Sequence, residues 1–391
     1  MLDRAHDPAL DGVRGLAILL VLGQHAPTRP LIDGFVGVTV FFCLSGYLIT
    51  TLLVRELQGG TIEVRAFYGR RAARIVPALV TVVVVTTAVL LVVRRDLATG
   101  QVLAPAGAAV TYTTSLFDWS NHVFVTGDYF NYTWSLSVEE QFYLVWPFAL
   151  LWGYRRHRRG FVVAAAALAT LCLALSVYLG VTRAVRYDQH EYFGTDVNAL
   201  PILAGALLAI AVHHGRLSWT PRRAGPAALA AVVLLPLLAH HDDTDRPALV
   251  TLAGTALTLV ILAGVGTAPR SAVRQLLASR PMRWLGERSY SIYLWNVLAR
   301  IAALALLGHT LVGDAAWVAL FVALSEASFR FVERPLRAAL RPGGRSAAAP
   351  GSLAVPVVEV RAELASKPPR PPLVELVETP EPCRQPGIAA D

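Results

Sequence analysis

Residues 75–93 read IVPALVTVVVVTTAVLLVV, and residues 161–179 read FVVAAAALATLCLALSVYL. Neither run contains a charged residue, and each is long enough, as a helix, to cross the roughly 30 Å hydrocarbon core of a bilayer. Of the 391 residues, 55% are hydrophobic and 16% are charged, whereas soluble domains carry about 25% charged residues. Several uncharged runs of this length predict an integral membrane protein.

Arginine placement orients the predicted helices, because short basic loops of multi-pass proteins face the cytoplasm. Arg-rich segments occur at 65–74, 155–159, 216–223, 270–288 and 334–341. A further apolar stretch, 101–117, is ambiguous, since a full crossing there would put the basic segments before and after it on opposite sides. We therefore treat it as re-entrant or interfacial, which leaves every Arg-rich loop and both termini in the cytoplasm.

The sequence thus predicts an all-α, polytopic membrane helix bundle of about ten transmembrane helices. The spans are predicted at 12–25, 34–54, 75–93, 136–152, 161–180, 200–213, 226–240, 249–266, 290–308 and 314–332.

The formal net charge of +8 raises the question of a nucleic-acid partner. Because the arginines lie in short loops between apolar runs, membrane insertion accounts for them and we predict no such partner. Nearly all basic residues are Arg, which indicates a GC-rich genome and a bacterial inner membrane as the location.

The composition changes after Pro342. Residues 342–391 are rich in Pro, Ala and mixed charge and contain no long apolar run. We predict a disordered cytoplasmic tail there, following a single transmembrane domain at 1–341. The three cysteines have no metal-ligating spacing, and we predict no metal site.

Few ionisable side chains lie inside the predicted spans, where each costs about 3 kcal/mol on insertion scales. Arg14 begins the first span and His25 ends it, Glu139 and Glu140 open the fourth, and Glu326 lies in the last. The predicted topology puts His25 and both opening glutamates toward the outer face, where a His–carboxylate pair can form. A carboxylate stabilises the imidazolium that forms when His takes a proton from a hydroxyl. Adjacent helical residues point about 100° apart, so one glutamate faces His25 and the other a different partner.

Each of these residues also has a structural interpretation. A His at the end of a span is commonly interfacial, and Arg14 can snorkel to the headgroups. A Glu in the first helical turn stabilises the helix dipole, with Ser135 or Ser137 as the N-cap. That interpretation explains one glutamate more readily than two.

The segment GFVGVTVFFCLSGY (34–47) contains the small residues Gly34, Gly37, Ser45 and Gly46. Because small residues let helices approach closely, they predict close helix–helix contact here. The sequence contains no Walker loop, dinucleotide fingerprint or HExxH motif, which argues against an ATP-driven pump, a Rossmann enzyme and a zincin.

Six motifs follow one another between Leu10 and Arg337. They are LDGVRG (10–15), GVTVFFCLSGYLI (37–49), FYGRRAARIVP (67–77), WSLSVEEQFYLVWP (134–147), GERSYSIYLW (286–295) and FVERP (331–335). Arg14 and His25, with ten residues between them, match a basic-x10-His signature. Together they resemble the acyltransferase-3 family of membrane-bound O-acyltransferases, which acylate sugars, lipopolysaccharide, peptidoglycan and macrolides.

The resemblance implies transfer of an acyl group, usually acetyl, from cytoplasmic acyl-CoA to a hydroxyl of a glycan, cell-envelope or secondary-metabolite acceptor. It implies acyl-CoA as a co-substrate and no permanently bound cofactor. His25 matches the essential histidine of the family, and Arg14, Arg71 and Arg74 match positions suited to a CoA donor. Guanidinium groups bind phosphates bidentately, which fits that assignment.

We therefore expect His25, oriented by Glu139 or Glu140, to act as general base, with Ser135 or Ser137 donating to the oxyanion. An acyl-histidine intermediate is the alternative mechanism. The sequence departs from the family at Asn296, where a His is usual, and at Asn198, where an Arg is usual. The alternative function is a proton-coupled secondary transporter, in which His25 and the glutamates relay protons.

Overall fold

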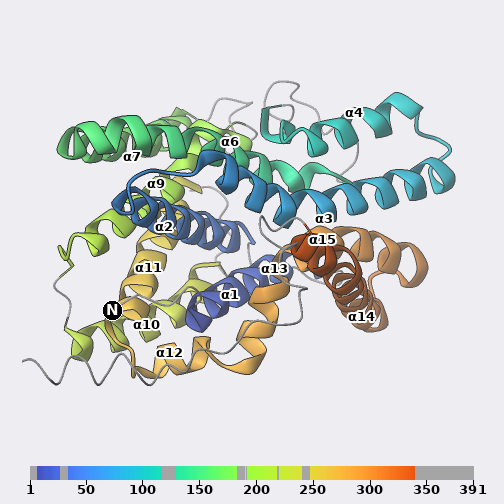
Figure 1. The fold of residues 1–391 in the computed structure, drawn as a ribbon. Helices are drawn as coiled ribbons and strands as arrows, with labels where there is room; N and C mark the ends of the chain where they lie inside the picture. The colour runs from blue at the N-terminus through green and yellow to red at the C-terminus, as the bar shows by residue number, and fades with distance from the viewer. Residues whose placement is uncertain are drawn as a thin grey trace, which may run out of the picture. The chain divides into compact units, whose positions relative to one another are not determined.

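The computed structural model describes residues 7–26, 34–116, 129–182, 190, 192–217, 220–239 and 247–339. In these ranges the chain forms helices and no strand, so the predicted all-α fold is confirmed (Figure 1). The predicted tail, 342–391, lies outside the described residues.

Thirteen α-helices occur in the described part of the chain. They are α1 (Pro8–His25), α2 (Phe35–Gln58), α3 (Val64–Val93), α4 (Thr99–Val110), α6 (Trp134–Phe148), α7 (Arg158–Thr182), α9 (Thr195–His213), α10 (Pro221–Ala239), α11 (Pro247–Thr267), α12 (Ala272–Leu277), α13 (Arg280–Leu307), α14 (Leu311–Ser328) and α15 (Arg334–Ala339). A 3₁₀ turn (Asn131–Thr133) precedes α6, and π-helical turns continue α6 (Ala149–Tyr154) and α14 (Phe329–Glu333).

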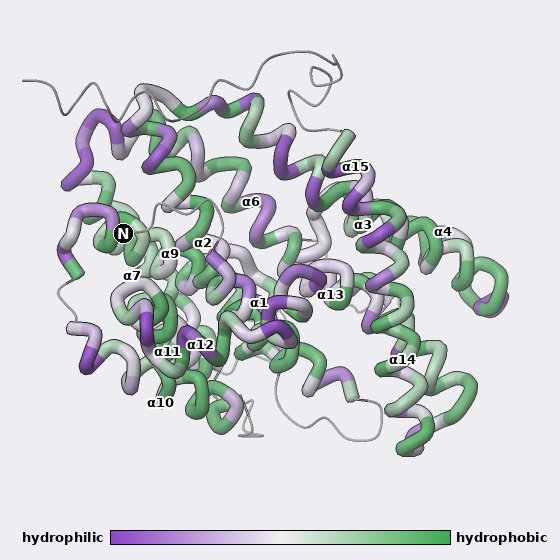
Figure 2. Tube along the Cα trace, turned by 60° about the horizontal axis from the view of Figure 1, so that its bottom comes forward, coloured by the Kyte–Doolittle hydropathy of each residue, from purple (hydrophilic) through white to green (hydrophobic). Residues whose placement is uncertain are grey.

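Each predicted span overlaps one of these helices, and eight of the described helices are long and apolar enough to cross a membrane by themselves. The two predicted spans outside that set are α1 and α6. These are the helices that carry Asp11 and Arg14, and Glu139 and Glu140. Figure 2 shows a largely hydrophobic trace along α3, α4 and α14. The chain is a multi-pass membrane protein, and the total of ten spans and the side of each terminus stay predictions.

Two helices begin about three turns before their predicted spans. Helix α3 starts at Val64 where the apolar run starts at Ile75, and α13 starts at Arg280 where the span was predicted from Tyr290. The apolar run marks only the membrane-embedded part of a helix, whereas Arg and Ala favour helix in any surroundings. The added turns matter because those of α3 carry Arg71 and Arg74.

Residues 99–110 form α4, which belongs to the stretch with the ambiguous topology. A helix of 12 residues rises about 18 Å, which is shorter than the roughly 30 Å hydrocarbon core. Helix α4 runs beside α3 (Figure 1) and ends at Val110, and the turn that follows it contains Tyr112, whose φ is 56°. Helix α4 alone therefore does not cross a bilayer.

Glycines set the spacing of the central helices, as the sequence predicted. A Cβ on Gly37 would lie 2.6 Å from the carbonyl oxygen of Ala17, so α2 packs directly on α1. A Cβ on Gly46 would overlap the Ile202 carbonyl oxygen, so α2 also packs on α9. These contacts fix how far each helix is displaced along its neighbour, and hence the depth at which its polar residues lie.

A surface clamp holds the end of α3 close to the start of the α6 segment. Arg94 donates two hydrogen bonds to Asp96, at 2.9 and 2.7 Å, and a third to the Tyr129 hydroxyl. The Arg94 guanidinium lowers the pKa of the Asp96 carboxyl to about 2, chiefly through these hydrogen bonds. Tyr129 precedes the 3₁₀ turn and α6, so the clamp helps to position the helix that carries the glutamates.

Candidate active site

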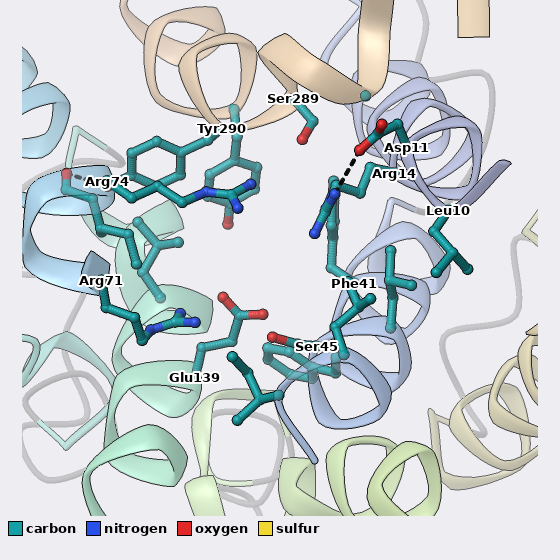
Figure 3. Close-up of a pocket in the computed structure, with 18 of the residues that line it drawn as sticks. Leu10, Asp11, Arg14, Phe41, Ser45, Arg71, Arg74, Glu139, Ser289 and Tyr290 are labelled. Atoms are coloured by element: carbon teal, nitrogen blue, oxygen red, sulfur yellow. Dashed lines mark hydrogen bonds and ion pairs between the residues drawn. The ribbon is translucent and has the colours of Figure 1, made fainter. Parts of the chain in front are cut away.

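A cavity of about 600 Å³ opens between α1, α2, α3, α6 and α13. One wall is apolar and belongs mostly to α2, which lines the cavity from Val38 to Leu52, a rise of about 21 Å. Charged side chains line much of the rest, and Figure 3 shows Arg71 and Arg74 of α3 extending into the space from one side and Arg14 of α1 from the other. We call this cavity the arginine pocket. Its charged lining residues are Asp7, Asp11, Arg14, Arg71, Arg74, Glu139, Glu140, Glu287 and Arg337.

Arg14 points into the bundle and not toward the membrane surface. Its Nη1 donates to Oδ1 of Asp11, one turn earlier on α1, at 2.8 Å. Asp11 is 3% exposed, so this is a largely buried carboxylate neutralised by a neighbouring guanidinium. The alternative interpretation of Arg14 as a headgroup anchor does not fit this geometry.

Arg71 is held by α6. Its Nη2 donates to Oε1 of Glu140 at 3.2 Å, and its guanidinium lies 3.2 Å from the centre of the Tyr143 ring. The Tyr68 hydroxyl, one turn earlier on α3, contacts the Leu144 carbonyl oxygen at 2.8 Å. Helices α3 and α6 are therefore joined at the level where Arg71 meets Glu140.

Arg74 differs from the other arginines of the pocket. Within the described residues, no carboxylate forms an ion pair or hydrogen bond with it, and its side chain is accessible from the pocket. The charges that act on it most strongly include those of Arg14, Arg337 and Arg71. A guanidinium surrounded by other guanidinium groups is a site that an anion would occupy.

The two glutamates of α6, Glu139 and Glu140, line this pocket. Glu139 lines the pocket together with Ser45 and Tyr143, and Figure 3 shows it between Arg71 and Ser45. Glu140 forms the ion pair with Arg71. Both carboxylates thus face arginines or hydroxyl donors inside the bundle.

His25 lies at the last residue of α1, outside the lining of the pocket. Its Nδ1 lies 2.8 Å from the carbonyl oxygen of Val21. A carbonyl oxygen only accepts hydrogen bonds, so Nδ1 carries the proton and Nε2 has the free lone pair in the neutral ring.

The predicted contact between His25 and a glutamate is not found: the structure records no ion pair or hydrogen bond between His25 and either Glu139 or Glu140, all of which it describes. The reason is that His25 and Glu139 lie at different depths in the helix bundle. Gly34, at the start of α2, packs against Gln24 beside His25, whereas Glu139 lies beside Ser45, eleven residues and about 16 Å farther along α2. The pocket itself reaches Val38, about one helical turn from the level of His25.

The two serines hold their protons in internal hydrogen bonds. The Tyr293 hydroxyl donates to the Tyr132 carbonyl oxygen at 2.5 Å, so Ser135, whose Oγ lies 2.6 Å from that hydroxyl, is the donor to it. Ser137 donates to the Thr133 carbonyl oxygen at 3.3 Å. Neither serine caps α6, because the N-cap is Thr133.

The two departures from the family pattern serve the backbone. The buried Asn296 amide donates to the carbonyl oxygens of Ile292 and Tyr293 on its own helix. The Asn198 amide donates to the Gly194 carbonyl oxygen and to that of Tyr192.

The sequence motifs do not single out three further residues: Tyr143 and Arg337, which line the pocket, and Arg300, on α13. Tyr143 carries no charge, and Arg337 was counted only as a loop arginine. Arg300 lies within the predicted span 290–308, where an ionisable side chain should have marked it. The fold and the pocket together define a multi-pass membrane protein with an arginine-lined internal cavity.

The chain belongs to the acyltransferase family, because the model of the family's acyltransferase domain matches residues 7–326. YrhL of Bacillus subtilis, which bears the name of a peptidoglycan O-acetyltransferase, is 32% identical over 84% of this chain and 55% of its own length. The peptidoglycan O-acetyltransferase OatA of Listeria monocytogenes is 28% identical over 85% of this chain and 56% of its own length.

The O-acetyltransferase OatA of Staphylococcus aureus is 29% identical, over 84% of this chain and 57% of its own length. The chain therefore spans a little over half the length of these relatives. No solved structure matches it. The family and the candidate spans identify a multi-pass bacterial membrane protein with an acyltransferase domain.

Proposed function

We propose that this protein transfers an acetyl group from acetyl-CoA to a hydroxyl of a cell-envelope glycan. The family match supports acyl transfer, and the names of the bacterial relatives support acetyl as the group and peptidoglycan as the class of acceptor. The observation that carries the proposal is the unpaired Arg74 among the arginines of a pocket that extends to within one helical turn of the level of His25.

The arginine pocket is the proposed donor site. Arg14, Arg71 and Arg74 are the residues that would bind the phosphates of CoA, each guanidinium offering paired N–H donors to phosphate oxygens. The α2 wall, with Phe41, Leu48 and other apolar side chains, would contact the uncharged pantetheine arm. The α2 wall extends about 21 Å toward His25. A pantetheine arm that lies along it, with the phosphates at the arginines, can therefore bring the thioester toward His25.

His25 is the proposed general base. Nε2 takes the proton of the acceptor hydroxyl, whose oxygen attacks the thioester carbonyl carbon and generates an oxyanion. The tetrahedral intermediate then collapses: the C–S bond breaks, the thiolate leaves and takes the proton from the imidazolium. The products are the O-acetyl ester and CoA thiol, and His25 returns to its neutral form. Val21 keeps the ring oriented through Nδ1 throughout.

Glu139, Glu140 and the two serines enter the proposal as supports for this geometry. The glutamates hold Arg71 and the α2–α6 contact in place before the donor binds. Ser135 or Ser137 would donate to the oxyanion only after giving up its present hydrogen bond to Tyr293 or Thr133. In the alternative mechanism Nε2 itself attacks the thioester and forms an acyl-histidine, which quenching with radiolabelled acetyl-CoA would trap.

Binding of acetyl-CoA to the purified full-length chain in nanodiscs tests the proposal against the transporter alternative. Titration calorimetry should show saturable binding that desulfo-CoA, which lacks the thiol but keeps the phosphates, competes for. A proton-coupled carrier has no reason to bind either compound. Absence of binding to protein that elutes as a single species would overturn the proposed donor.

A further inference from the structure

The arginine pocket has a further arginine, Arg337 on the short helix α15, and a buried carboxylate holds it in place. Its Nη2 donates to Oε2 of Glu333, one turn earlier, at 2.5 Å. Glu333 is 1% exposed, and its other oxygen accepts a hydrogen bond from the Ser291 hydroxyl on α13. The Nε of Arg337 is buried and has no hydrogen-bond partner within the described residues. The guanidinium is thus oriented through one nitrogen and keeps an N–H donor for a ligand.

Helix α13 places Arg337 near Arg74. The Tyr290 hydroxyl of α13 donates to the carbonyl oxygen of Ile75, the residue after Arg74, at 2.9 Å. The next residue, Ser291, leads through the buried carboxylate to Arg337. Helices α15 and α3 also contact each other directly, and the charge of Arg337 acts on Arg74 accordingly. One part of the pocket therefore holds two guanidinium groups with donors to offer, which suits an anion.

Exposed ion pairs next to Arg337 mark the water-facing edge of the pocket. Phe329 lines the pocket, and its ring centre lies 5.7 Å from the Arg337 guanidinium and 4.7 Å from that of Arg288. Arg288 bonds Glu326, which also pairs with Arg330, and the Arg330 side chain is 64% exposed. Charged side chains with this exposure lie in water and not in hydrocarbon. The pocket therefore meets the aqueous phase near Arg337.

The positions of Arg71 and Arg337 match the order of groups along acetyl-CoA. Arg71 lies within the bundle, where it pairs with Glu140 beside the Tyr143 ring. In acetyl-CoA the pantetheine arm separates the thioester from the pyrophosphate, and the 3′-phosphate is on the ribose beyond it. With the thioester toward His25, the 3′-phosphate comes to the water-facing edge. A phosphate monoester carries a charge of about −1.5 to −2 and three acceptor oxygens, which suit a guanidinium.

We propose that Arg337 binds the 3′-phosphate of CoA and makes this protein select acetyl-CoA over donors that lack this phosphate. Glu333 is the positioning residue that orients the guanidinium for it. Arg14, Arg71 and Arg74 then serve the pyrophosphate. The inference rests on the proposed use of acetyl-CoA as the donor.

Titration calorimetry of the purified full-length chain in nanodiscs tests this assignment with acetyl-CoA and acetyl-3′-dephospho-CoA, which differ only in the 3′-phosphate. We expect wild type to bind acetyl-CoA about tenfold or more tightly than the dephospho compound, because hydrogen bonds between charged groups are the strong ones. Arg337→Gln should weaken acetyl-CoA binding by the same factor and leave binding of the dephospho compound within about twofold. Arg74→Gln, which removes a proposed pyrophosphate contact, should weaken both.

Arg334→Gln is the matched control, since Arg334 is an exposed arginine on the same short helix. It should bind both ligands like wild type. Arg337→Lys, which keeps the charge and loses the fork of donors, should prefer acetyl-CoA by a smaller factor than wild type.

Three results would overturn the role of Arg337 alone: equal affinity of wild type for the two ligands, an undiminished preference for acetyl-CoA in both Arg337 variants, or equal losses of both ligands in Arg337→Gln. The last result would make Arg337 a structural residue or a pyrophosphate contact. A wild-type protein that elutes as a single species and binds neither ligand would instead overturn the proposed donor.

Discussion

The arginine pocket and the His25 end of α1 handle charge in opposite ways. In the pocket most charges are already matched, with Arg14 on Asp11 and Arg71 on Glu140. At the other end, the only hydrogen bond recorded for His25 within the described residues is to a carbonyl oxygen of its own helix. A region that binds a ligand with permanent charge keeps its cations in fixed positions before binding. A region whose charge appears only during a reaction leaves its donors and lone pairs free.

Removal of the imidazole should have the largest effect. We expect His25→Ala to lower acetyl transfer about 1,000-fold, because general-base catalysis typically contributes between about 100- and 10,000-fold. Binding of acetyl-CoA should stay within twofold of wild type, since His25 lies outside the arginine pocket. The measurement is thiol release together with titration calorimetry.

His157→Ala is the matched control for that variant, because His157 is an exposed histidine between helices. It should leave transfer unchanged. If His25→Ala turns over normally while the protein remains folded, His25 is not the general base. Donor binding and catalysis would then not be located at separate ends of the molecule.

The close contact between α1 and α13 beside Arg14 should have the next largest effect. In Gly286→Ala, the new methyl group would overlap the Asp11 carbonyl oxygen, so α1 and α13 must move apart. Overpacking of this kind costs about 1–3 kcal/mol. We expect a lower thermal midpoint and a loss of turnover, because Asp11, which pairs with Arg14 in the pocket, lies at this contact.

Gly266→Ala provides the comparison, since no atom lies within 4 Å of the position that its Cβ would take. It should be neutral. Equal thermal midpoints for the two variants, measured by the fluorescence of a thiol-reactive dye on Cys43 and Cys172, would mean that α1 and α13 tolerate separation.

The same contacts explain what the sequence predicted and what it did not. Each predicted span became a helix, because an uncharged run is a local property of the chain. The pairing of His25 with a glutamate failed because it depends on how far α1, α2 and α6 are displaced along one another. That displacement is set by contacts such as Gly37 on Ala17, whose partners are distant in sequence.

Side-chain hydrogen bonds were equally inaccessible from the sequence. The motif WSLSVEEQ identifies Ser135 and Ser137 as polar residues near the glutamates, and both lie there. Whether a hydroxyl proton is free depends on Tyr293, which comes from a helix more than 150 residues later. Arg300, by contrast, is visible in the sequence as a charged residue in an apolar run.

Arg74 should have an intermediate effect, confined to the donor. Arg74→Gln removes a guanidinium that has no carboxylate partner within the described residues, so a bound anion loses a charge-assisted hydrogen bond worth about 1.5–3 kcal/mol. We expect the KM for acetyl-CoA to rise at least tenfold, with kcat changed less than threefold. Arg65→Gln, which alters an exposed arginine on the same helix, should leave KM unchanged. A fall in kcat at constant KM would move Arg74 out of the donor site.

The smallest expected effect concerns Glu140, and it distinguishes the arginine pocket from the His25 end most directly. The sequence predicted Glu140 as a possible partner of His25, whereas the structure places it beside Arg71 in the pocket. Glu140→Gln keeps the shape of the side chain and removes the charge that holds Arg71 at 3.2 Å. An anionic donor then enters a pocket with one negative charge fewer, and Arg71 is free to turn toward it.

We therefore expect the KM for acetyl-CoA to fall between twofold and fivefold in Glu140→Gln, with kcat little changed, because a partly exposed ion pair contributes about 0.2–1 kcal/mol. A carboxylate that oriented His25 would give the reverse, a large fall in kcat at constant KM. Glu139→Gln, measured in parallel, should resemble Glu140→Gln more than His25→Ala, since Glu139 lies beside Ser45, about 16 Å from the level of His25. If kcat falls as far in either glutamine variant as in His25→Ala, the glutamates and His25 act together in catalysis, and the separation of the two sites is wrong.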